Sequence, residues 1–236
     1  LRIMLDAARL EKSDVVLEVG PGLGTLTGPM VERTRRVIAI EKDSRLFQWL
    51  EKHLAQSSNL RMIHADALAI DLSSLLKEEG VTKVVSNLPY SVGSRILVEL
   101  FSAATPPRRI QVTVQKEVAD RLKAAPDTAD YGLLSVWAQS LYDVALGHVI
   151  SGGCFYPEPQ VQSALVDLAW REKQIVGRDR WPVLMRLTKR AFEHRRKKLG
   201  TSLRGVALEA AGIDPNDRPE NIAPAAWCRL AEVELP

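Results

Sequence analysis

The chain has 236 residues, of which 46% are hydrophobic and 26% charged, and its formal net charge at pH 7 is +3. This composition excludes a disordered tail protein, a collagen-like repeat and a small disulfide-rich secreted scaffold. The two cysteines, Cys154 and Cys228, lie far apart and lack metal-ligand spacing, so we expect a reduced cytoplasmic protein without a structural metal.

Short apolar runs alternate with amphipathic stretches in the first half of the chain. The apolar runs predict strands at residues 15–20, 37–41, 61–66, 83–87 and 110–114. Leucine, isoleucine and phenylalanine at helical spacing predict helices over residues 44–56 and 92–103. Continuous apolar strands separated by helices are typical of a parallel sheet that is covered on both faces. The sequence therefore predicts an α/β fold with a doubly wound, Rossmann-like sheet.

The pattern changes after residue 114. Helices are predicted over residues 115–124 and 132–141, with a polar loop between them at 125–130. Two strands at 144–150 and 164–170 predict a hairpin, which makes a seven-stranded sheet with one antiparallel strand. Only helices are predicted beyond residue 171, at 182–200, 203–211 and 224–233. We expect a sheet domain over residues 1–174 and a small all-helical domain over 175–236.

Positive charge is concentrated in the C-terminal part. Residues 171–236 hold 14 Lys and Arg against 9 Asp and Glu and so carry +5, whereas the first 170 residues carry −2. This asymmetry predicts a polyanionic partner, and a solvated basic helix is an equal alternative. The candidate phosphate contacts, about half of which we expect to be merely solvated, are Lys189, Arg190, Arg195, Arg196, Lys197 and Lys198. No apolar run reaches the roughly 18–20 residues of a membrane span, so no membrane partner is expected.

A glycine-rich turn follows the first predicted strand, with the sequence Glu-Val-Gly-Pro-Gly-Leu-Gly at residues 18–24. Glycine at every second position lets the backbone bend tightly and approach a ligand that a Cβ would obstruct. The spacing differs from the dinucleotide motif, and the Lys-Ser/Thr of a phosphate-binding loop is missing. The turn therefore predicts a ligand without a diphosphate, and a simple strand-to-helix turn is the alternative.

Acidic residues end the next two strands. Glu41, followed by Lys42, can accept hydrogen bonds from both hydroxyls of a ribose, although a solvated charge at a strand end is also possible. Asp66 and the backbone N–H of Ala67 can bind the edge of an adenine. A glycine turn, a ribose acid and an adenine acid on successive strand ends predict a nucleoside pocket without phosphate ligands. S-adenosylmethionine fits that pocket better than any nucleotide does.

The fourth strand ends in Asn87-Leu88-Pro89-Tyr90. Pro89 fixes its own φ and favours an extended Leu88, so the Asn87 side-chain oxygen and the Leu88 carbonyl can converge on one exocyclic amine. Tyr90 offers a flat face for base stacking, which is worth about 1–3 kcal/mol. The alternative is a proline turn with a core tyrosine.

Together these motifs resemble the ribosomal RNA adenine N6,N6-dimethyltransferases (KsgA-type). The resemblance extends over essentially the whole chain and includes further segments at residues 115–122, 131–136, 155–161, 192–199 and 217–220. It implies a class I methyltransferase domain over residues 1–174 and a helical, RNA-contacting domain over 175–236. The implied cofactor is S-adenosylmethionine, with no metal.

The resemblance also implies a role for each site residue. The cofactor-binding residues would be Glu18, Gly20, Gly22, Glu41, Lys42, Asp66, Ala67 and Asn87. The catalytic segment would be Asn87, Leu88, Pro89 and Tyr90, with Tyr90 and Phe155 on either side of an extruded adenine. The implied reaction dimethylates two adjacent adenosines in a hairpin loop near the 3′ end of small-subunit ribosomal RNA, on an immature small ribosomal subunit. We expect a monomer.

Three features depart from the family pattern. Ser91 stands where the family usually has Asn, and Gln160 stands where a basic residue is common. The family's Gln-Asn-Phe-Leu segment, which closes over the cofactor, is expected just upstream of Leu1. The alternatives are methylation of large-subunit RNA (macrolide-resistance type) or of another nucleic-acid adenine, and a non-catalytic assembly or transcription factor. The basic C-terminal signature favours the small subunit, and the intact Asn87–Tyr90 motif favours an enzyme.

Overall fold

A computed structural model of the chain describes residues 2–54, 56–151, 153 and 161–234. The chain divides into two compact units, one formed by residues 1–119 and 145–169 and the other by residues 120–144 and 170–236. The predicted domain boundary after residue 174 stays a prediction, because this division follows packing and places residues 120–144 with the C-terminal region.

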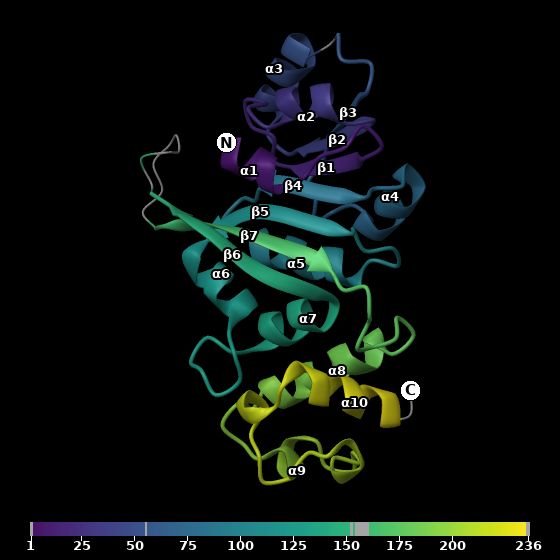
Figure 1. The fold of residues 1–236 in the computed structure, drawn as a ribbon, viewed down its shortest axis with the longest axis vertical. Helices are drawn as coiled ribbons and strands as arrows, with labels where there is room; N and C mark the ends of the chain where they lie inside the picture. The colour runs from purple at the N-terminus through teal and green to yellow at the C-terminus, as the bar shows by residue number, and fades with distance from the viewer. Residues whose placement is uncertain (1, 55, 152, 154–160, 235–236) are drawn as a thin grey trace. The chain divides into compact units, whose positions relative to one another are not determined.

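The sheet has seven strands in the order β3-β2-β1-β4-β5-β7-β6 (Figure 1). The strands are β1 (Val15–Val19), β2 (Arg36–Glu41), β3 (Leu60–His64), β4 (Lys83–Asn87), β5 (Arg109–Gln115), β6 (Tyr142–Ile150) and β7 (Ser163–Trp170). The first five pair in parallel, and β7 runs antiparallel to β5. The predicted fold class, a mostly parallel Rossmann-like sheet of seven strands with one antiparallel strand, is confirmed.

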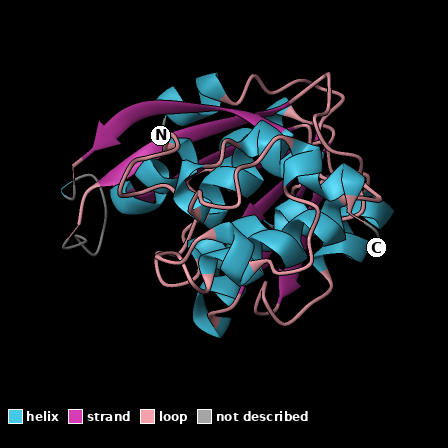
Figure 2. Ribbon diagram, turned by 90° about the horizontal axis from the view of Figure 1, so that it is seen from below, coloured by secondary structure: helices cyan, strands magenta, loops and turns pink. Residues whose placement is uncertain are grey.

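Helices flank the strands of this sheet (Figure 2). They are α1 (Arg2–Ala7), α2 (Thr27–Arg33), α3 (Ser44–Leu54), α4 (Leu72–Glu79) and α5 (Gly93–Ser102). Helix α3 packs against β2 and β3, α1 against β5, and α4 against α5. Because helices cover the sheet, every residue of β1 is buried, and all of them except Glu18 are apolar.

The second unit is mainly helical. After α6 (Lys116–Lys123), which begins in the first unit, it contains α7 (Leu133–Leu141), α8 (Trp181–Phe192), α9 (Leu199–Ser202), α10 (Pro224–Val233) and two 3-10 turns, Glu209–Ala211 and Pro219–Asn221. Helices α7, α8 and α10 pack against one another, and each contains a buried tryptophan, namely Trp137, Trp181 and Trp227. Within the described part of the chain, no helix is long and apolar enough to cross a membrane. The same residues contain no group of three or more His, Cys, Asp or Glu able to hold a metal ion.

The prediction of one helix over residues 182–200 is wrong beyond Phe192, where α8 ends. Residues 193–198 form turns before the short helix α9. The chain leaves the helical path where Arg195 binds Glu220, a contact between residues 25 positions apart. The predicted helix 203–211 is likewise reduced to a 3-10 turn, because Gly205 adopts φ +87°.

Candidate active site

The candidate site lies along the carboxyl edge of the sheet, where β1, β2, β3 and β4 end. These strands are parallel and in register, with Val19 opposite Ile40 and Glu41 opposite His64. The residues predicted from sequence follow these strand ends, and side-chain and backbone contacts join several of them.

The turn after β1 has glycine at three positions with positive φ, and the space around a Cβ differs between them. Gly20, Gly22 and Gly24 have φ values of +73°, +59° and +75°, which side-chain-bearing residues rarely adopt. A Cβ on Gly20 would lie 3.3 Å from Cγ of Pro89, so the turn packs against the Asn87–Tyr90 segment. A Cβ on Gly24 would lie 2.7 Å from Cδ2 of Leu50, whereas a Cβ on Gly22 would meet nothing within 4 Å. Gly22 is therefore the position at which the turn faces open space, and its predicted contact with the cofactor stays a prediction.

Glu41 fixes the glycine turn from the end of β2. Its side chain is only 6% exposed, and its carboxylate accepts the N–H of Gly22 at 3.2 Å and the N–H of Asp43 at 2.8 Å. An ionised carboxylate has about four acceptor positions, so these two bonds leave capacity for two hydroxyl donors. The sequence predicted the ribose role of Glu41 but not its bond to the turn.

Glu18 lies in β1 and is 1% exposed. Burial raises the pKa of its carboxyl group to about 8, and the nearby Glu41 adds to the rise, while the hydrogen bond from Thr27 opposes it. The Thr27 hydroxyl donates to Oε2 of Glu18 at 2.6 Å. Glu18 thus ties β1 to the first residue of α2, and its predicted place among the cofactor-binding residues stays a prediction.

Asp66 lies two residues beyond the end of β3. Its carboxylate accepts the ammonium of Lys42 at 2.8 Å and the backbone N–H of Leu68 at 2.9 Å. These two hydrogen bonds, that of Lys42 first, lower the pKa of Asp66 below its ordinary value. Asp66 is therefore an ionised acceptor at neutral pH, and the adjacent Ala67 is buried.

The segment after β4 is a surface turn held by one buried side chain. Leu88 is 2% exposed and donates its N–H to the carbonyl of Thr113 at 3.1 Å, whereas Asn87 and Pro89 are exposed. Tyr90 is half-buried, and its hydroxyl is hydrogen-bonded to that of Ser163. Because Tyr90 is only half-buried, the alternative of a proline turn with a core tyrosine is disfavoured, while the predicted role of Asn87 stays a prediction. Phe155, the predicted second stacking residue, lies outside the described residues.

The six candidate phosphate contacts differ in their surroundings. Lys189 and Arg190 are exposed at the end of α8, and Lys198 donates to Oδ1 of Asn216 at 2.9 Å. Arg196 and Lys197 are exposed and, among the residues with described positions, form no hydrogen bond or ion pair through their side chains. These two side chains are therefore the best placed for a polyanion.

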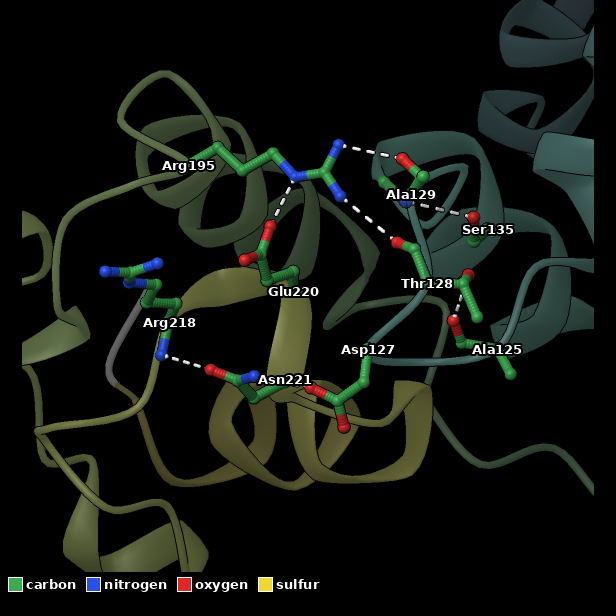
Figure 3. A network of polar contacts seen from close by, with 10 residues as sticks. Ala125, Asp127, Thr128, Ala129, Ser135, Arg195, Arg218, Glu220 and Asn221 are labelled. Carbon is green, nitrogen blue, oxygen red and sulfur yellow. Dashed lines mark hydrogen bonds and ion pairs between the residues drawn. The ribbon is translucent and has the colours of Figure 1, made fainter.

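Arg195, in contrast, is engaged within the protein (Figure 3). Its Nε donates to Oε2 of Glu220 at 2.6 Å, and its two terminal nitrogens donate to the carbonyls of Ala129 at 3.0 Å and Thr128 at 3.2 Å. The N–H of Asp127 donates to the Glu220 carbonyl at 2.9 Å. This network joins the turn after α8, the loop before α7 and the turn that contains Glu220. Arg195 therefore has fewer free N–H donors for a polyanion than Arg196 and Lys197 have.

Known proteins with similar sequences show which family shares these features. The model of the family described as ribosomal RNA adenine dimethylase matches residues 2–234. The chain belongs to that family. This dimethylase-family chain is 34% identical to ribosomal RNA small subunit methyltransferase A of Clostridium acetobutylicum, over 97% of this chain and 86% of the relative. It is 35% identical to the protein of the same name from Geobacillus thermodenitrificans, over 100% of this chain and 86% of the relative.

Two solved structures are similar to this dimethylase-family chain. The dimethyladenosine transferase from Plasmodium falciparum has a TM-score of 0.79 and 22% identity over 96% of this chain and 92% of its own, which supports the fold. The 23S rRNA methyltransferase ErmE has a TM-score of 0.70 and 26% identity over 98% of this chain and 94% of its own. The predicted family and enzyme class, a ribosomal RNA adenine dimethyltransferase, are confirmed, and the large-subunit alternative fits less well.

The sequence did not indicate two polar side chains that support the site. Thr27 bonds Glu18, and Ser163 bonds Tyr90. Thr27 is the first residue of helix α2, and Ser163 is the first residue of strand β7. A hydroxyl residue at the start of a helix or strand is the sequence signal that could have indicated them.

Proposed function

We propose that this chain transfers methyl groups from S-adenosylmethionine to N6 of two adjacent adenosines in a hairpin loop near the 3′ end of small-subunit ribosomal RNA, within an immature small ribosomal subunit. The observation that carries the proposal is the contact between the glycine turn and the Asn87–Tyr90 segment, at Gly20 and Pro89. This contact puts the predicted cofactor turn and the predicted amine-binding segment side by side. The names of the two curated relatives support the small-subunit substrate.

The residues at this edge fit S-adenosylmethionine. The position of a Gly22 Cβ has no neighbour within 4 Å, Glu41 has two spare acceptor positions for ribose hydroxyls, and Asp66 is an ionised acceptor suited to an adenine amino group. The strand-to-helix turn has no lysine that would bind a diphosphate. When bound, the cofactor would supply an electrophilic methyl group on a sulfonium.

The protein's own contribution is to orient and activate the target amine. An adenine amine is a poor nucleophile because its lone pair is delocalised into the ring. The Asn87 side-chain oxygen and the Leu88 carbonyl accept hydrogen bonds from the two N–H groups of this amine. These two bonds favour a tetrahedral nitrogen and direct its lone pair at the methyl group. The proton of the methylated, strongly acidic amine leaves to water. For the second methylation the amine keeps one N–H, so one acceptor suffices.

Tyr90 binds the flipped base by stacking. Flipping costs a few kcal/mol, and least in a loop, where stacking and pairing are weakest. Stacking on an aromatic side chain stabilises the flipped base by about 1–3 kcal/mol. A hairpin loop is therefore the RNA element that this site would bind most readily.

A methyl-transfer assay tests the proposed substrate. Labelled S-adenosylmethionine is incubated with the protein and with unmethylated small and large ribosomal subunits in parallel, and modified nucleosides are mapped by mass spectrometry. We expect label in two neighbouring N6,N6-dimethyladenosines of the small-subunit RNA. Label in large-subunit RNA alone would refute the substrate assignment and favour the activity suggested by the resemblance to ErmE.

Replacing Gly22 by alanine is expected to lower the affinity for S-adenosylmethionine by about tenfold or more, a loss of about 1.4 kcal/mol. The added Cβ enters the open side of the turn. Isothermal titration calorimetry measures the affinity. Gly80→Ala is the control, because Gly80 also has a positive φ, +65°, and no neighbour within 4 Å of a Cβ. It imposes a similar backbone strain of about 1–2 kcal/mol away from the site. Equal affinities for the two variants would contradict the assignment of Gly22.

Replacing Arg196 and Lys197 together by alanine is expected to weaken RNA binding and to flatten its salt dependence. Each lost phosphate contact reduces the slope of log K against log salt by about 0.7–0.9. Fluorescence anisotropy with an RNA hairpin at several salt concentrations measures this slope. The double variant Lys52→Ala, Lys77→Ala is the control, since it removes the same charge from exposed positions in the first unit. An unchanged slope would mean that Arg196 and Lys197 are only solvated.

A further inference from the structure

The hydroxyl groups of Tyr90 and Ser163 form a hydrogen bond that joins two strands which are not neighbours in the sheet. Tyr90 follows β4, Ser163 is the first residue of β7, and β5 lies between these strands. The Tyr90 side chain therefore reaches across the carboxyl end of β5. Ser163 is completely buried, so its hydroxyl has little access to water as an alternative partner.

The backbones on both sides of this bond are fixed. Ser163 pairs in antiparallel register with Gln115, and the preceding carbonyl, of Gln162, accepts the N–H of Lys116 at 2.9 Å. On the other side, the Pro89 carbonyl accepts the N–H of Val92 at 3.1 Å. A tyrosine on a fixed backbone has two side-chain torsions left. A bond to the Tyr90 hydroxyl fixes the first torsion and so the place of the ring, and it biases the ring plane because a phenol O–H prefers to lie in that plane.

We propose that Ser163 is a positioning residue for the target base: it holds the Tyr90 ring at the place where its face can stack on an adenine whose amine is bound at Asn87. The inference rests on the proposed function. It assigns a role to the buried Ser163 hydroxyl, which the proposed mechanism does not otherwise use. Without the bond the Tyr90 side chain can swing away about its first torsion, so fewer flipped bases are held in line for methyl transfer. The cofactor-binding residues at the ends of β1, β2 and β3 are unaffected.

The kinetic test separates this role from a purely structural one. Ser163→Ala is expected to lower kcat for RNA methylation by about 5–10-fold, the effect of losing about one net hydrogen bond. The affinity for S-adenosylmethionine should stay within about twofold of the wild type, because no cofactor-binding residue is changed. Tyr90→Phe should have the same effect as Ser163→Ala, the double variant should be no slower than either, and Ser163→Thr, which keeps the hydroxyl, should restore most of the rate. Additive losses in the double variant would overturn the proposal.

Ser140→Ala is the matched control. Ser140 is also completely buried, and its hydroxyl donates to the Val136 carbonyl at 2.7 Å and accepts the weak hydrogen bond of the Cys228 thiol at 3.3 Å, but it lies in α7, which contributes no residue to the candidate site. This variant should lower the midpoint of thermal unfolding by a few degrees, as Ser163→Ala should, because a net hydrogen bond is lost in each. Its kcat should equal that of the wild type. A kcat loss as large as that of Ser163→Ala would show that reduced stability explains both, and would refute the positioning role.

A binding measurement keeps this proposal distinguishable from the proposed function. Single-stranded RNA carrying 2-aminopurine, whose fluorescence falls when the base stacks, is titrated with wild type, Ser163→Ala and Tyr90→Phe. We expect strong quenching with wild type and equally weaker quenching at saturation with the two variants. Full quenching with Ser163→Ala would refute the proposal even if the wild type methylates small-subunit RNA. Absence of methyl transfer by the wild type, with the expected quenching pattern, would refute the proposed reaction and leave the positioning of a stacked base supported.

Discussion

Replacing Asn87 by alanine is expected to lower kcat for RNA methylation by about 10²–10³-fold, the usual effect of removing one preorganised polar group that stabilises a transition state. Asn87 is exposed at the end of β4, and the Leu88 carbonyl beside it would then be the one remaining acceptor of the segment for the amine. We expect the alanine variant to keep the proposed cofactor contacts of Glu41 and Asp66. Single-turnover transfer of labelled methyl groups to unmethylated small subunits measures the loss.

Asn87→Asp is the companion variant. Aspartate keeps an acceptor oxygen at the same place, so it should retain measurably more activity than alanine. The affinity of both variants for S-adenosylmethionine, measured by calorimetry, separates an effect on the amine from an effect on the cofactor site. Wild-type kcat in Asn87→Ala would overturn the mechanism, because the other side-chain oxygen of the Asn87–Tyr90 segment, the Tyr90 hydroxyl, is already bonded to Ser163.

Replacing Glu18 by glutamine is expected to stabilise the protein near pH 8 and to leave its stability near pH 4.5 almost unchanged. In the folded protein burial raises the pKa of Glu18 from 4.5 to about 8. Between these two pH values the folded state holds a proton that the unfolded state has lost, so stability falls as pH rises, by about 1.4 kcal/mol per pH unit from this group. Glutamine mimics the protonated acid and carries no such dependence, so the gain near pH 8 should be about 2–4 kcal/mol.

Urea unfolding at pH 5, 6.5 and 8 measures the effect of Glu18→Gln. The free energy of unfolding of the variant should exceed that of the wild type by an amount that grows with pH and levels off above about pH 8. Glu99→Gln, on the exposed face of α5, is the control and should not alter the pH dependence. Parallel curves for wild type and Glu18→Gln would show that the Glu18 pKa is the same in the folded and unfolded states.

The sequence alone determined the fold class and the places where site residues had to lie. Buried parallel strands are covered on both faces, so they appear as continuous apolar runs, and the prediction of a strand at residues 83–87 agrees with β4 at both ends. Motifs that follow such strands must gather at the carboxyl edge of the sheet. For that reason the order of motifs along the chain was enough to assign the glycine turn, Glu41, Asp66 and Asn87 to one edge.

Only the tertiary structure decided which of these groups touch and how their charges behave. The bonds from Gly22 to Glu41, from Tyr90 to Ser163 and from Arg195 to Glu220 join residues far apart in the chain, and no local pattern encodes such pairs. The same holds for the end of α8 at Phe192 and for the raised pKa of Glu18. These features have a common physical reason. Packing decides which hydrogen-bond partners a group meets and how far it is removed from water, whereas the sequence pattern mainly indicates which face of each helix or strand is buried.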